Sequence, residues 1–137
     1  MSMKYRFVLI AALAFVLLLF AGKWAINLLE PFRSFTVTVH NESGRPIVAV
    51  ETGINTGSPN TSDVSKHDYE EVIDAGESVK IKPRLTVSGE SSIYQKFTYE
   101  NGETKDVVVC GYTEYASGYS KVTLRADGTV DVEQKCM

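Results

Sequence analysis

The fold is decided by residues 35–50, which read Phe35-Thr-Val-Thr-Val-His-Asn-Glu-Ser-Gly-Arg-Pro-Ile-Val-Ala-Val50. Apolar and polar side chains alternate over the first six positions, which is the period of two that a half-buried strand shows. Gly44 can adopt a positive φ and Pro46 cannot donate a ladder hydrogen bond, so the middle of the stretch predicts a turn. A second β-rich run starts at Ile47. The stretch therefore predicts a strand, a turn and another strand.

The chain after this stretch repeats the pattern. Asn101-Gly102 and Asp127-Gly128 are the strongest turn signals, because a type I′ hairpin turn needs positive φ at both central residues. No helical period of useful length follows residue 30. Short strands at a spacing of roughly 8–12 residues are typical of an all-β fold. We expect a small immunoglobulin-like β-sandwich of about seven or eight strands, with further strands at 79–81, 85–87, 93–99, 107–110, 119–124 and 130–132.

A different composition precedes the strands, since 21 of the 25 residues in segment 5–29 are apolar. Residues 7–29 would form a helix of roughly 34 Å at ~1.5 Å per residue, enough to cross a hydrocarbon core of ~30 Å. Two interpretations stay open, an uncleaved signal-anchor and a cleaved signal peptide. Cleavage prefers small residues at positions −3 and −1, and cutting after Ala21 puts Leu19 at −3. We therefore favour the uncleaved anchor.

Charge near the apolar segment predicts its orientation. Lys4 and Arg6 precede it, which favours a cytoplasmic N-terminus by the positive-inside rule, although Lys23 and Arg33 beyond it weaken the asymmetry. We expect a single-pass protein of the cytoplasmic membrane with its C-terminal domain outside; the alternative is a domain secreted after signal cleavage. The expected order is a cytoplasmic basic n-region 1–6, a transmembrane signal-anchor 7–29, a linker 30–34 and an extracytoplasmic β-sandwich domain 35–137.

The two cysteines, Cys110 and Cys136, both lie in the expected domain. Their spacing fits neither a CxxC redox pair nor a zinc site, which needs four ligands at close spacing. In a small exported domain the usual state of two cysteines is one disulfide. We predict that this bond ties the C-terminal residues to a central strand, while two buried, reduced thiols are the alternative.

The net charge of −3 conceals a division, because residues 30–137 carry 11 basic and 17 acidic side chains and hence −6. Nucleic acid is an unfavourable partner for such a domain, since affinity for it comes from Lys and Arg at the phosphates. Calcium favours a tight loop of DxDxDG type, whereas Asp68-Tyr-Glu-Glu-Val-Ile-Asp74 lacks that spacing. We expect no metal and no cofactor.

Catalytic patterns are also missing from the sequence. His40 lies on the outward face of the first expected strand and His67 in a polar loop, and neither belongs to a GxSxG, SxxK or HExxH motif. Cys110 is assigned to the disulfide rather than to nucleophilic attack. We expect that the protein is not an enzyme, and a carboxylate-dependent hydrolase is kept only as a remote alternative.

Three segments could instead recognise a partner. The long polar segment 53–68 exceeds the usual loop length, and such loops are usually functional or mobile. The segment 112–119 interleaves tyrosine with serine and glycine, as protein-binding loops often do, although tyrosine is also a good strand residue. An acidic run, which is equally typical of a solvated charged face, lies between them. The candidate partner-binding residues are Asp68, Glu70, Glu71, Asp74, Tyr112, Tyr115 and Tyr119.

The expected function is a membrane-anchored, extracytoplasmic and non-catalytic binding or accessory module of the cell envelope. It would contact the membrane through residues 7–29 and engage a protein partner through one of the three segments. One specific version is a toxin-immunity or inhibitor protein, for which small size, acidity and anchoring are all suitable. The alternative of another class is a structural subunit of a membrane complex, in which the apolar span itself makes the contacts.

Overall fold

The computed structural model describes residues 2–29, 34–56 and 65–137, and the chain divides into two compact units, Met1–Glu30 and Pro31–Met137. The first unit is the helix α1 (Met3–Leu29), none of whose residues is buried. Its 27 residues, with a mean hydropathy of 2.3 in the most apolar window, are enough to cross a membrane. An N-terminal signal sequence would pass the same test of length and composition. The predicted linker 30–34 lies, apart from Ser34, outside the described residues.

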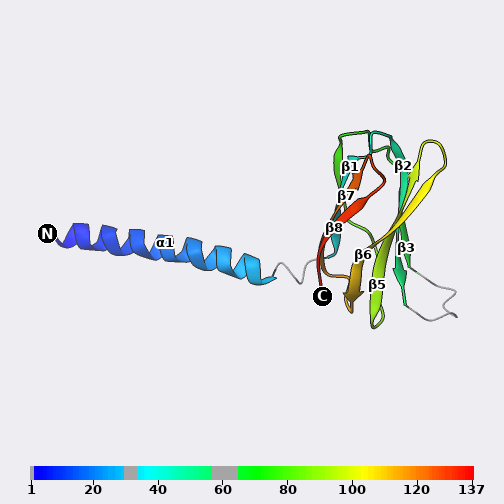
Figure 1. Ribbon diagram of the computed structural model, residues 1–137. Helices are drawn as coiled ribbons and strands as arrows, with labels where there is room; N and C mark the ends of the chain where they lie inside the picture. Colours follow the sequence, from blue (N-terminus) through cyan, green and yellow to red (C-terminus); the bar gives the residue numbers. More distant parts are fainter. Residues whose placement is uncertain (1, 30–33, 57–64) are drawn as a thin grey trace. The chain divides into compact units, whose positions relative to one another are not determined.

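The second unit is an all-β sandwich, as the alternating sequence predicts (Figure 1). Its two sheets have four strands each, in the orders β4-β1-β7-β8 and β3-β2-β5-β6. The strands are β1 (Thr36–Glu42), β2 (Ile47–Asn55), β3 (Lys66–Tyr69), β4 (Ser78–Ile81), β5 (Ser91–Tyr99), β6 (Thr104–Thr113), β7 (Gly118–Arg125) and β8 (Val130–Cys136).

The order of the strands is what the sequence could not show. Strand β1 lies between β4 and β7 and runs parallel to β7, with Val39 opposite Val122, whereas the other pairings are antiparallel. Strands β1 and β2 lie in opposite sheets. In a constant-type immunoglobulin domain the first two strands share one sheet. The two-sheet architecture is therefore the one expected, and its strand order is different.

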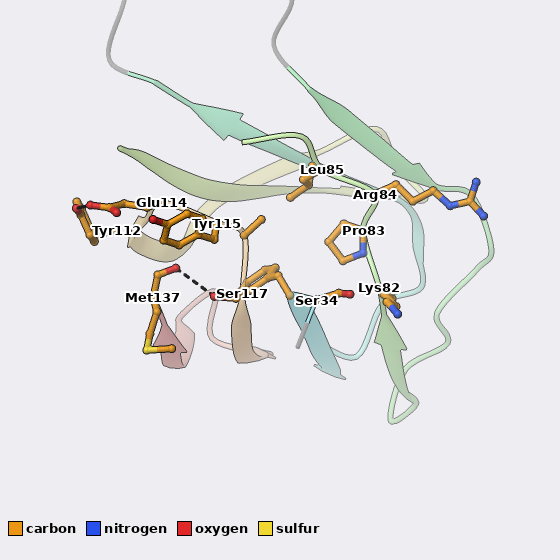
Figure 2. Close-up of a pocket in the computed structure, with 12 residues that line it drawn as sticks. Ser34, Lys82, Pro83, Arg84, Leu85, Tyr112, Glu114, Tyr115, Ser117 and Met137 are labelled. Atoms are coloured by element: carbon orange, nitrogen blue, oxygen red, sulfur yellow. Dashed lines mark hydrogen bonds between the residues drawn. The ribbon is translucent and has the colours of Figure 1, made fainter. Parts of the chain in front are cut away.

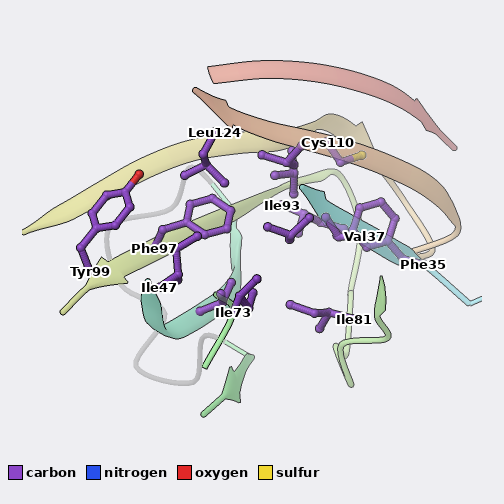
Figure 3. Packing of buried hydrophobic residues seen from close by; sticks show 14 residues of the cluster. Phe35, Val37, Ile47, Ile73, Ile81, Ile93, Phe97, Tyr99, Cys110 and Leu124 are labelled. Carbon is purple, nitrogen blue, oxygen red and sulfur yellow. The ribbon is translucent and has the colours of Figure 1, made fainter. Parts of the chain in front are cut away.

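The core forms where the inward faces of the two sheets meet (Figure 3). Every second residue of β5, from Ser91 to Tyr99, is buried, and the same alternation in β1 buries Val37 and Val39. Burying an aliphatic or aromatic side chain contributes roughly 1.5–3 kcal/mol. The largest buried apolar side chains are those of Phe35, Phe97, Ile47, Ile73, Ile81, Ile93 and Leu124.

A disulfide joins the two sheets at one side of the sandwich. Cys110 lies in β6 and Cys136 in β8, with their Cα atoms 6.2 Å apart. Strands β6 and β8 are edge strands of different sheets, so the predicted bond is present but Cys110 lies in an edge strand and not in a central one. The covalent bond thus links two edges that share no ladder hydrogen bonds.

Two predictions about the strands are wrong. The structure assigns no strand at 85–87, and it adds β3, which includes His67, where the sequence predicted part of a polar loop. Strand β3 is a short edge strand that pairs through its backbone with 50–53 of β2. An edge strand with one exposed face can carry polar side chains, and in β3 Tyr69 packs against the core. The loop predicted at 53–68 thus shrinks to the segment between β2 and β3, of which 57–64 lie outside the described residues.

Both strong turn signals mark real hairpins, but the turn type is different. Only the glycine of each pair has positive φ, 83° at Gly102 and at Gly128. The amide of Gly102 donates to Tyr99 O at 2.9 Å, and that of Gly128 donates to Arg125 O at 3.1 Å. These are three-residue loops, in which a type I turn is followed by a glycine in the left-handed conformation.

Candidate functional site

One end of the sandwich carries an open groove of about 1120 Å³. Figure 2 shows its two sides: Tyr112, Glu114 and Tyr115 on one, and the segment after β4 on the other. We call these the tyrosine side and the basic side. Ser34, Phe35, Ala116, Ser117 and Met137 complete the lining. The groove therefore collects residues from five parts of the domain: the start of β1, the end of β4, the end of β6, the β6–β7 loop and the residue after β8.

The tyrosine side is built by the short loop between β6 and β7. The Thr113 Oγ1 accepts a hydrogen bond from the Ala116 amide at 3.0 Å and donates one to Met137 O. The Ala116 carbonyl accepts from the Phe35 amide at 2.9 Å. Ala116 has a φ of 48°, which is unfavourable for a residue with a Cβ, so its neighbours impose this conformation. The loop is therefore held in one shape by β1 and by the C-terminal residue.

Two tyrosines on this side are strongly exposed, Tyr115 of the loop at 78% and Tyr112 of β6 at 52%. The Tyr112 hydroxyl donates a hydrogen bond to Glu114 Oε1. That carboxylate is the main reason why the pKa of Tyr112 rises to about 12, because ionising the hydroxyl would place two negative charges together. Tyr112 thus stays a neutral donor at physiological pH. Exposed aromatic rings on a fixed loop are typical of protein-binding surfaces.

The basic side consists of residues 82–85, which directly follow β4. Pro83 is buried and Leu85 half-buried, whereas Lys82 and Arg84 are exposed. Neither cation forms an ion pair with any residue that the structure describes. These two neighbouring cations form a small positive surface on a unit whose net charge is negative.

The opposite end of the sandwich shows how a cation behaves when it has partners. Arg45 lies beside a hollow of about 280 Å³. Its guanidinium pairs with Glu103 and lies 4.3 Å from the centroid of the Tyr99 ring. The same guanidinium lowers the pKa of Glu103 through a hydrogen bond. These contacts link the β1–β2 turn to the β5–β6 hairpin. The charged residue beside the hollow therefore has a structural role, whereas Lys82 and Arg84 in the groove have no such contacts with the described residues.

The predicted site residues fall in different places. Tyr112 and Tyr115 line the groove, but Tyr119 lies in β7, half-buried and outside it. The acidic candidates Asp68, Glu70, Glu71 and Asp74 are exposed on β3 and on the connection to β4, and none lines the groove.

The acidic run does not gather into a metal site within the described ranges. No group of three or more His, Cys, Asp or Glu side chains there could hold an ion. Tyr69 donates to Glu71 Oε2 at 3.1 Å, and the Asp74 amide donates to Glu77 Oε2 at 3.0 Å. These local hydrogen bonds organise the turn before β4.

The groove also contains residues that the sequence did not single out, namely Lys82, Pro83, Arg84, Leu85 and Met137. The one signal in this part of the sequence was the alternation over 85–87, and it predicted a paired strand rather than an unpaired segment that lines a groove. The position of Met137 follows from the β7–β8 hairpin, which places Gly118 opposite Cys136 and so brings Met137 beside Ser117.

His40 and Cys110, which the sequence analysis considered for catalysis, do not line the groove. The Nδ1 atom of His40 is 2.6 Å from Ser78 Oγ on the outward face of β1 and β4. The sulfur of Cys110 is in the disulfide, so it cannot act as a nucleophile in this state.

Comparisons with known proteins add little. No protein-family model matches the chain. No curated protein matches it either. Among solved structures, the chain is similar to a protein from Eubacterium rectale whose structure was determined by NMR, with a TM-score of 0.43, 11% sequence identity, and coverage of 76% of this chain and 90% of that one.

Proposed function

We propose that the chain is a membrane-anchored, extracytoplasmic and non-catalytic binding module, and that the groove is where it contacts a protein partner. The observation that carries this proposal is the exposure of Tyr112, near the end of β6, and of Tyr115, on a loop of fixed shape. Large exposed apolar side chains cost solvation unless something covers them, so a cluster of them often marks an interface. Met137, 42% exposed, extends the same surface.

The anchor in this proposal is α1, left uncleaved, with the N-terminus inside. Its length and composition support a membrane span. A disulfide persists in oxidising compartments, so the bond between Cys110 and Cys136 supports a location outside the cytoplasm. The sandwich would act as an immunoglobulin-like scaffold in architecture, though not in strand order, presenting a loop at its end.

Within this class, a toxin-immunity or inhibitor protein is the specific version that we favour. Such a protein needs a compact binding surface and a position at the membrane that the toxin reaches. The groove supplies the first and α1 the second. The acidic residues of β3 and its following turn would be a separate surface, since they lie outside the groove.

The test is site-specific photo-crosslinking in cells that express the full chain. A benzophenone amino acid at Tyr115 should give one discrete adduct, whereas the same substitution at Tyr119, a tyrosine outside the groove, should give none. Substitution at Glu70 examines the acidic surface, and substitution at Ile10 examines the helix. An adduct from Ile10 with none from Tyr115 would favour a structural subunit of a membrane complex and would sink the groove proposal.

A further inference from the structure

The basic side of the groove continues as residues 82–87, which we call the edge segment and which pair with no strand in the described parts of the chain. Its side chains alternate as in a strand: Pro83 is buried, Leu85 and Val87 are half-buried, and Lys82, Arg84 and Thr86 are exposed. In the described parts of the chain, its backbone forms a hydrogen bond from the Thr86 amide to Ser65 Oγ, at 2.9 Å. The segment therefore shows the alternating burial of a strand, and its other backbone groups form no hydrogen bond with the described residues.

The reason for this lies in the neighbouring strand. Strands β1 and β4 pair up to Val37 and Ile81, and two more steps in the same register would bring Phe35 opposite Pro83 of the edge segment. The Phe35 amide instead donates to Ala116 O at 2.9 Å, and Ser34 forms a bridge with Ser117. The start of β1 is thus committed to the β6–β7 loop. The edge segment is left at one side of the groove with its backbone available.

A free extended edge is a site where another strand can add, because its amides and carbonyls can continue a sheet. Side chains of an added strand would alternate in the same way as those of the edge segment. Its outward side chains would lie beside Lys82 and Arg84, which have no ion-pair partner among the described residues. Opposite charges in such cross-strand positions are favourable and like charges are not.

The same pattern disfavours a second copy of this chain as the occupant. Two edge segments side by side would bring their Lys82 and Arg84 side chains together, which is repulsive. The inward side chains of the added strand would meet Leu85, Tyr115 and Met137, a largely apolar surface. Charge and polarity together specify an occupant that is acidic on one face and aliphatic on the other.

We propose that the groove binds an extended peptide segment of a partner protein, in which acidic and aliphatic residues alternate, by strand addition to residues 82–87. This inference rests on the proposed function and names the kind of partner that the same groove takes. Main-chain hydrogen bonds would supply part of the affinity, while Lys82 and Arg84 would select acidic side chains. The interaction should weaken with salt, since the two cations are exposed.

The methionines provide a local reporter for this binding. The chain has three, Met1, Met3 and Met137, and Met137 lines the groove. The full chain, labelled with ¹³C at the methionine methyl groups, is placed in phosphatidylcholine nanodiscs and titrated with a six-residue peptide of alternating Glu and Val. We expect the Met137 resonance to shift in a saturable manner while those of Met1 and Met3 stay in place.

Matched peptides and variants separate the contributions. A Lys and Val peptide should not shift Met137, and a Glu and Val peptide N-methylated at alternate amides should bind at least tenfold more weakly. The double variant Lys82→Glu/Arg84→Glu should also lose at least tenfold in affinity. The control Lys105→Glu/Lys121→Glu makes the same change in net charge at exposed positions outside the groove and should bind as the natural chain does.

Three results would overturn the inference. The first is the absence of a Met137 shift with the Glu and Val peptide at millimolar concentration. The second is equal binding of the N-methylated peptide, which would exclude strand addition. The third is a Met137 shift caused by anionic phosphatidylglycerol in the nanodisc and not by peptide, which would assign the groove to a lipid surface. In each of these cases Tyr115 could still crosslink to a partner protein. The inference about the peptide can therefore fail while the proposed function holds.

Discussion

At the scale of single residues, Gly118 fixes the end of the sandwich that carries the groove. It is the first residue of β7 and lies opposite Cys136 in β8. Its φ is +99°, and a Cβ at this position would lie 2.1 Å from the Lys135 carbonyl oxygen. Both the backbone conformation and the close approach of β8 therefore require glycine.

Replacing Gly118 with alanine should lower the free energy of unfolding by about 3 kcal/mol or more. The left-handed conformation accounts for roughly 1–2 kcal/mol and the clash with β8 for the remainder. Gly128 is the matched control, since its φ is +83° and nothing lies within 4 Å of its virtual Cβ. Urea unfolding of the full chain in micelles measures both. Equal losses for Gly118→Ala and Gly128→Ala would show that the contact with Lys135 is unimportant.

A second residue-scale prediction concerns the outer face of the β3-β2-β5-β6 sheet. Glu51 accepts a hydrogen bond from the Tyr94 hydroxyl at 2.8 Å and pairs with Lys66 at 3.2 Å. The Tyr94 hydrogen bond is the main reason why the pKa of Glu51 lies below its ordinary value of 4.5, and Lys66 adds to it. A lowered pKa in the folded state stabilises the fold above the ordinary pKa, and this contribution is lost as the pH falls through the folded value.

The variant Glu51→Gln should therefore be less stable than the natural chain at pH 6, by up to about 1 kcal/mol because the pair is partly exposed. This difference should shrink as the pH falls below 4.5 and disappear once Glu51 is protonated in the folded state. Tyr94→Phe should raise the pKa of Glu51, so that its titration in an NMR experiment moves to higher pH. A stability difference that stays constant between pH 6 and pH 3 would refute the assignment.

At the scale of elements, the disulfide is a covalent cross-link between the two sheets, in addition to the loops that connect their strands. The chain between Cys110 and Cys136 includes the β6–β7 loop that forms the tyrosine side. Closing a loop of this size in the unfolded chain is worth about 3 kcal/mol. The bond therefore stabilises both the sandwich and the shape of the groove.

The double variant Cys110→Ser/Cys136→Ser should unfold at a temperature lower by roughly 15 °C, since 1 kcal/mol corresponds to about 4–8 °C in a domain of this size. Reductant should have the same effect on the natural chain and none on the double variant. Calorimetry of the full chain in micelles gives the measurement. Two thiols that react with alkylating reagent in native, unreduced protein would contradict the prediction.

The elements also show what the sequence can and cannot predict. Runs with clear alternation and an apolar face, such as 35–39 and 93–99, are strands in the structure, because burial of one face decides their conformation. Strand β3 is missed because its polar side chains carry no such signal and its pairing is through the backbone. The run 85–87 alternates equally well and is not in a ladder, because the start of β1 bonds to Ala116 instead.

The candidate site was predictable only in part for the same reason. The tyrosines at 112 and 115 could be proposed because their composition is typical of binding loops. Lys82 and Arg84 carry no signal of their own and become significant through the strand order, which brings the end of β4 to the same end of the sandwich as the β6–β7 loop. Sequence spacing cannot show which strand ends lie together.

At the scale of the whole molecule, the chain joins two units with different chemistry. The unit Met1–Glu30 consists mainly of an apolar helix, and the unit Pro31–Met137 is an acidic sandwich with a core of its own. Under the proposed function, the helix determines where the protein is located and the sandwich recognises the partner. The proposed function therefore depends most directly on the side of the membrane on which the sandwich lies.

Cysteine accessibility in intact cells measures this location. Ser2→Cys and Thr129→Cys are introduced separately, and cells are treated with a membrane-impermeant maleimide before and after permeabilisation. We predict that the exposed Thr129→Cys site reacts in cells whose outer layers are opened, that Ser2→Cys reacts only when the cytoplasmic membrane is permeabilised, and that both chains run at the full 15.1 kDa. Labelling of Ser2→Cys alone in intact cells, or loss of the N-terminal segment from the mature chain, would contradict the anchored, outward-facing arrangement.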